Sequence, residues 1–61
     1  MAWVAVDKIG GELISQTEPF RIGDYWIGVS IFHLPKGSIK KLIGKDLFWN
    51  DEPVELKGEW L

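Results

Sequence analysis

One stretch of this chain, residues 34–45, combines helical spacing of apolar residues with signals for the start and end of a helix. Ser38 is a suitable N-cap, and Gly44 suits the left-handed residue that follows a helix end. Three apolar residues fall on one side of the helix at i, i+3 and i+4: Ile39, Leu42 and Ile43. About two turns of helix are unstable alone. We therefore expect this stripe to dock on a sheet.

Sequence typical of β-strands lies on both sides of this helix. Five strands are predicted, in chain order 2–7, 12–15, 25–34, 46–49 and 54–57. The last two are expected to form a closing hairpin around the polar turn 50–53. Gly28 predicts a bulge or sharp bend inside the third strand. Residues 16–25 are interpreted as a connection that the buried side chains of Phe20 and Ile22 pin to the body of the domain.

The order β-β-β-α-β-β predicts a mainly β domain with one short helix, an α+β arrangement. The first strand is apolar on both faces, with Trp3 and Ala5 on one side and Val4 and Val6 on the other. Such a strand lies between two layers or in a closed barrel. We expect a small five-stranded SH3-like or OB-like barrel or bent sheet, and both closures stay open.

The chain is short for a self-sufficient core. Its 61 residues predict a single small domain, 1–61, and the absence of cysteine removes disulfides and thiolate metal sites. Four Trp, three Phe and one Tyr can supply much of the buried area. Self-association is a second way to stabilise so small a domain, so a homo-oligomer is an open alternative.

The net charge of −2 argues against a general nucleic-acid or membrane-surface binder. The first residues lack the basic segment of a signal peptide, and no apolar run approaches the roughly 20 residues of a membrane span. A soluble, intracellular protein is the resulting expectation, with no membrane partner.

Catalytic and metal-binding motifs are not evident in the sequence. His33 is the only histidine, and Asp7 or Asp24 would have to orient it beside a serine. Zinc requires Cys or several His, and the acids near residue 51 lack the pattern of a calcium loop. Gly10-Gly11 lacks the Gly-Lys-Ser/Thr pattern of a phosphate loop. We expect no catalytic residues, no metal site and no cofactor.

Two features are candidate binding surfaces. Four of the seven basic residues cluster around the helix: Lys36, Lys40, Lys41 and Lys45. They form either a solvated helix face that complements the dipole or a patch for single-stranded nucleic acid. From Asp46 onward the chain carries five acids and one base, a charge separation suited to protein partners or self-contacts. Trp60, outside any predicted element, is either an interface residue or packs on the domain.

Two longer motifs, residues 34–44 and Asp51-Glu52-Pro53-Val54-Glu55-Leu56, make the chain resemble small uncharacterised proteins encoded by bacteriophages and prophages. The opening Trp3-Val4-Ala5-Val6-Asp7 and the spacing of Pro19, Arg21 and Trp26 are similar too. Where such proteins carry Asp-Gly after the first strand, this chain has Ile9-Gly10-Gly11. The resemblance implies a phage-type accessory protein in a bacterial cytoplasm, and it implies no chemistry.

These observations predict a non-enzymatic protein-binding module of phage type, an inhibitor or adaptor that acts on a host protein. One alternative is a small barrel that binds single-stranded nucleic acid through the basic patch of residues 36–45. Another is a structural or assembly protein of a virion. The missing catalytic set, the separated charges and the apolar tail favour the first.

Overall fold

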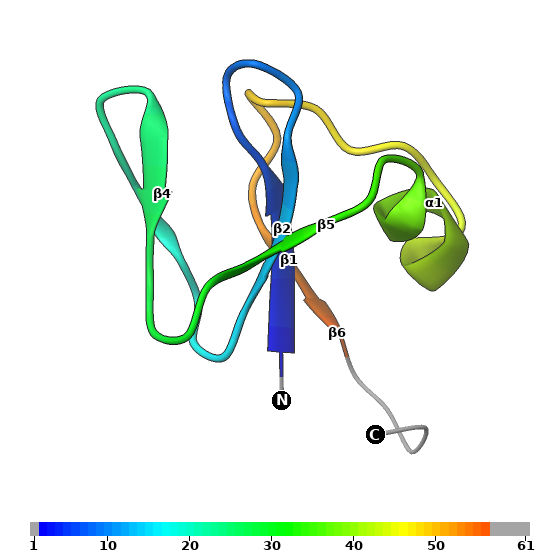
Figure 1. Ribbon diagram of the computed structural model, residues 1–61, viewed down its shortest axis with the longest axis horizontal. Helices are drawn as coiled ribbons and strands as arrows, with labels where there is room; N and C mark the ends of the chain where they lie inside the picture. The colour runs from blue at the N-terminus through cyan, green and yellow to red at the C-terminus, as the bar shows by residue number, and fades with distance from the viewer. Residues whose placement is uncertain (1, 57–61) are drawn as a thin grey trace.

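Four antiparallel strands form the central sheet of the computed structural model, which describes residues 2–56 (Figure 1). They are β1 (Ala2–Val6), β2 (Glu12–Ser15), β5 (Phe32–Leu34) and β6 (Val54–Leu56), in the order β5-β2-β1-β6. A separate two-stranded hairpin consists of β3 (Phe20–Ile22) and β4 (Tyr25–Ile27). The helix α1 (Ser38–Ile43) precedes β6.

The prediction of a mainly β fold with one short helix is confirmed. The helix lies on one side of the four-stranded sheet and the β3–β4 hairpin on the other (Figure 1). The core on the helix side is built from Val4, Val6, Ile39 and Leu56, and the core on the hairpin side from Ala5, Leu13 and Trp26. The two apolar faces of β1 therefore contact different layers. Over residues 2–56 the sheets stay open and form no closed barrel.

The single strand predicted over 25–34 is wrong, because this segment is divided into β4 and β5. The predicted bend is present: β4 ends just before Gly28, and the chain bends at Val29 and Ser30. A Cβ on Gly28 would lie 2.6 Å from the hydroxyl of the buried Ser15, so only glycine fits there without displacement. Ser30 adopts a positive φ of 54° just beyond. The segment 12–34 is thus one long hairpin that bends, so that β3 and β4 cross the other face of the sheet.

The predicted closing hairpin is also wrong, because residues 46–49 form no strand and β6 pairs with β1. Leu47 packs on the helix-side core, whereas Trp49 packs on the hairpin-side core. A turn follows at once, in which the Phe48 amide donates to the Asp51 carboxylate at 2.9 Å. Apolar residues alternate in this segment as they would in a strand, because Leu47 and Trp49 contact the two different cores.

The predicted N-cap of the helix is wrong, and its predicted C-terminal glycine is confirmed. Gly37, at φ 92°, is the N-cap residue, and the Ser38 hydroxyl donates instead to the Pro35 carbonyl. The carboxylate of Glu12 accepts hydrogen bonds from the amides of Gly37 and Ile39, at 2.7 and 2.8 Å. A side chain of β2 therefore satisfies the helix N-terminus. At the other end Gly44 has φ 79° and donates to the Lys40 carbonyl.

Replacement of Glu12 by Ala should lower the free energy of unfolding by about 1–2 kcal/mol, because two amides of the helix start lose their acceptor. Urea unfolding followed by circular dichroism measures the change. Glu18→Ala removes an exposed carboxylate and serves as the control, expected within about 0.5 kcal/mol of wild type. Equal losses in both variants would contradict a capping role for Glu12.

Two of the three residues in the predicted helix stripe are in the core. Ile39 is 2% exposed and Ile43 packs beside it, but Leu42 is 37% exposed. With six residues, α1 turns less than two full times, so it presents only a narrow side to the sheet. No helix in the described part of the chain is long and apolar enough to cross a membrane.

Candidate functional site

The outer side of the β3–β4 hairpin is entirely apolar. Its four side chains, here called the hairpin face, are 56%, 55%, 70% and 43% exposed: Phe20, Ile22, Tyr25 and Ile27. Across the hairpin Phe20 pairs with Ile27, and Ile22 pairs with Tyr25. Because alternate residues of a strand share a side, both pairs lie on one surface. The result is a continuous apolar surface on the β3–β4 hairpin. This hairpin lies on the side of the sheet away from α1 (Figure 1).

The inner side of the same hairpin is anchored by Trp26. Its ring is buried in the hairpin-side core, and the indole N–H donates to the Val6 carbonyl at 2.7 Å. The ring also meets Trp49 edge-on, with the centroids 5.8 Å apart and the planes at 71°. Such contacts join β4 both to β1 and to the segment that precedes β6.

Arg21 lies between the two tryptophans and joins them. Its guanidinium carbon is 4.6 Å from the Trp26 ring centroid and 4.7 Å from that of Trp49. One terminal nitrogen donates to the Trp49 carbonyl at 2.8 Å and to the Asp51 carbonyl at 3.3 Å. These cation–π contacts and hydrogen bonds hold β3 against the body of the domain. The backbone beneath the hairpin face is therefore held in position before any partner binds.

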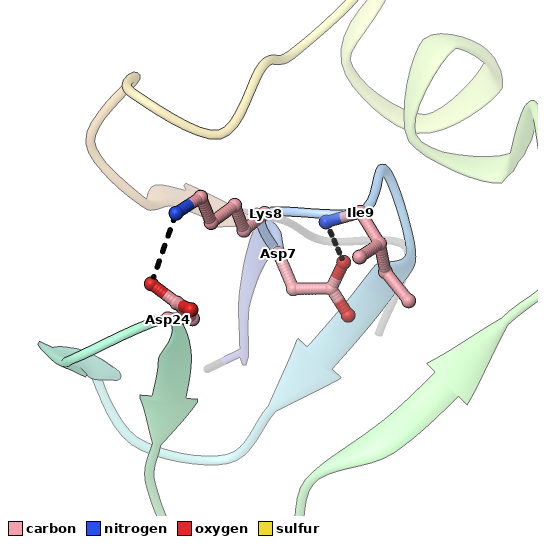
Figure 2. Close-up of polar contacts among 4 residues, drawn as sticks. All are labelled: Asp7, Lys8, Ile9 and Asp24. Atoms are coloured by element: carbon pink, nitrogen blue, oxygen red, sulfur yellow. Dashed lines mark hydrogen bonds and ion pairs between the residues drawn. The ribbon is translucent and has the colours of Figure 1, made fainter.

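An ion pair links the β1–β2 turn to the β3–β4 turn. The Lys8 ammonium is 3.3 Å from the Asp24 carboxylate, as Figure 2 shows, and both side chains are exposed. Solvent screening limits such a pair to about 0–1 kcal/mol. The neighbouring Asp7 carboxylate accepts from the Ile9 amide at 3.1 Å (Figure 2) and from the Gly11 amide at 2.7 Å. Asp7 thus accepts from amides of its own turn, whereas Asp24 pairs with Lys8 of the β1–β2 turn.

The residues considered for catalysis are not brought together. His33 is exposed in the edge strand β5, where it pairs with Leu13 of β2. Among residues 2–56, no hydrogen bond joins His33 to a serine or a carboxylate, and no group of three His, Asp or Glu is placed to hold a metal ion.

The predicted basic residues lie on the helix side of the sheet. Lys40 and Lys41 are exposed in α1, and Lys45 is exposed just beyond its end. Lys36 does not lie in this helix; it lines a cleft of about 470 Å³, together with the acids Glu12 and Asp46. The β3–β4 hairpin, which carries the hairpin face and its two exposed aromatic rings, lies across the sheet from α1 (Figure 1). This separation does not favour joint stacking and phosphate contacts, so nucleic-acid binding by the basic patch stays a prediction.

Trp60 lies outside the described residues. The hairpin face was missed, because Pro19 and Gly23 led to the interpretation of residues 16–25 as a connection. The predicted burial of Phe20 and Ile22 is wrong, since their side chains are 56% and 55% exposed. The usable signal was the pair of short segments rich in aromatic and β-branched residues, 20–22 and 25–27, on either side of Gly23-Asp24, a two-residue turn sequence typical of hairpins.

Comparison with protein-family models, with curated proteins and with solved structures finds no match to this chain. The function is therefore inferred from the hairpin face and from the contacts of Arg21 and Trp26 that hold it in place.

Proposed function

We propose that this chain is a non-enzymatic protein-binding module of phage type, an inhibitor or adaptor that acts on a host protein in the bacterial cytoplasm. The hairpin face is its binding surface. The sequence resemblance supports the phage context, and the geometry of the hairpin supports protein binding. An SH3-like or OB-like relationship belongs to the same proposal, supported by the bent 12–34 hairpin and by the helix that precedes the last strand.

The composition of the hairpin face is the observation that carries this proposal. An antiparallel hairpin with one solvated side normally alternates apolar and polar residues. Here Trp26 is buried on the inner side, yet all four outer residues are apolar and each is more than two-fifths exposed. Contiguous apolar surface of this kind on a small soluble domain marks an interaction site. Phe and Tyr are also among the residues enriched in interfaces.

The support of the hairpin face favours binding over a structural role within the domain. Arg21 and Trp26 fix the backbone of β3 and β4 from the inner side. Little ordering of the surface would be needed on association, which lowers the entropic cost of binding. An apolar face that is held in place in this way suits a folded protein partner with a complementary apolar surface.

Capture from a bacterial lysate tests the proposal. Ile22→Lys places a charge in the hairpin face, and a specifically captured protein should fall about tenfold or more. Leu42→Lys is the matched control, because it adds the same charge to a partly exposed aliphatic residue on α1. The control should capture as wild type does.

A captured protein retained by Ile22→Lys would contradict the assignment of the hairpin face. Trp60→Ala, run in parallel, tests the interface residue predicted from the sequence. Circular dichroism of each variant ensures that the comparison is made between folded proteins.

A further inference from the structure

The hairpin face is complementary to itself. Phe20 is paired with Ile27 and Tyr25 with Ile22, so the two rings occupy opposite corners of the face. A second copy can be turned by 180° about an axis in the plane of this face, either along the strands or across them. In both cases each ring meets an aliphatic side chain of the other copy. Ring-on-ring clashes are avoided in both arrangements. A surface that matches itself under a two-fold rotation is what an isologous dimer requires.

We propose that a second copy of this chain binds the hairpin face and forms a weak, reversible two-fold homodimer. The inference rests on the proposed function, since it takes the same face as the binding surface, and it names one partner for that face. Charge does not oppose this pairing at the turn end, because Asp24 is neutralised by Lys8. The outward side chains of the face itself carry no charge.

The size of the hairpin face determines how strongly two copies are expected to associate. Four partly exposed side chains offer on the order of 400 Å² per copy. Two copies would then bury roughly 800 Å², below the 1,200–2,000 Å² of stable specific interfaces. We therefore expect a dissociation constant on the order of 100 µM, so that dimers form only in concentrated solution. At lower concentration the hairpin face is free for another protein.

Analytical ultracentrifugation of the purified chain tests the dimer. The mean mass of the wild type should rise from monomer toward dimer between about 10 µM and about 1 mM. Phe20→Thr should weaken association about tenfold or more. Phe32→Thr is the matched control, because Phe32 is 65% exposed in the equally short β5, outside the hairpin face. Its association should stay within about twofold of wild type.

Amide chemical shifts of the wild type, followed on dilution, locate the contact without any variant. Shifts concentrated in residues 20–27 support the dimer. A monomer at every concentration, dilution shifts confined to other segments, or equal weakening by Phe20→Thr and Phe32→Thr would each overturn it.

The dimer and the proposed function can fail separately. Lysate capture is run with the chain below about 1 µM, where it is monomeric by this account. A chain that stays monomeric to about 1 mM, but loses a captured protein on Ile22→Lys, overturns the dimer alone. A dimer that depends on Phe20 supports the inference, even where a captured protein is insensitive to Ile22→Lys and the proposed function fails.

Discussion

Replacement of Ile39 by Ala should remove a large part of the stability of this domain. Ile39 is 2% exposed and packs among Val4, Val6 and Leu56, where the helix meets the sheet. Truncation of a buried Ile to Ala costs about 2–5 kcal/mol, because transfer energy is lost and a cavity remains. A domain of this length has a total stability of about 3–9 kcal/mol. Urea unfolding followed by circular dichroism should show the midpoint move sharply toward zero.

Leu42→Ala is the matched control for this effect. Leu42 lies one turn further along α1 but is 37% exposed, so truncation removes fewer contacts. We expect a loss of about 1 kcal/mol or less. If Leu42→Ala proved as destabilising as Ile39→Ala, the orientation of α1 on the sheet would be wrong.

Replacement of Trp26 by Ala should be at least as destabilising, by about 3–5 kcal/mol. The ring fills the core on the hairpin side, and Arg21 and Trp49 both contact it. Its loss should detach the hairpin from the sheet. Chemical denaturation measures the stability change. Amide exchange in residues 20–27 should also become faster than in β1 and β2, because the hairpin opens locally.

Two further variants separate the causes of this effect. Trp26→Phe keeps an aromatic ring but leaves the buried Val6 carbonyl without its donor, at an expected cost of about 1–3 kcal/mol. Tyr25→Ala removes the neighbouring ring from the exposed side of β4 and should change stability by about 1 kcal/mol or less. Equal effects of Tyr25→Ala and Trp26→Ala would contradict the assignment of inner and outer sides.

Several features of the fold follow from short-range sequence patterns. The spacing of Ile39 and Ile43 predicts the side of the helix that packs, and Gly44 predicts where the helix ends. Apolar residues on both faces of β1 predict its place between two layers. Gly28 predicts the bend. In each case the cause is local, because side-chain period and backbone freedom depend on near neighbours in the chain.

The errors arose where a distant residue decides the local structure. Ser38 is a sound N-cap in sequence, yet the acceptor that satisfies the helix start is Glu12, separated by 25 and 27 residues from the amides it binds. Leu47 and Trp49 alternate as a strand would, yet they pack on different cores and leave β6 to pair with β1. Sequence periodicity indicates which residues share a side, and it does not indicate which element covers that side.

The same distinction applies to the candidate site. By itself, the sequence determined a small, mainly β domain with one short helix that ends at Gly44 and a first strand that is apolar on both faces. Only the tertiary structure decided that Trp26 faces inward while Phe20, Ile22, Tyr25 and Ile27 stay exposed. All are apolar or amphipathic, so hydrophobicity alone cannot divide them. The division depends on contacts of Trp26 with Val6, Trp49 and Arg21, which lie far from it in sequence or on the paired strand.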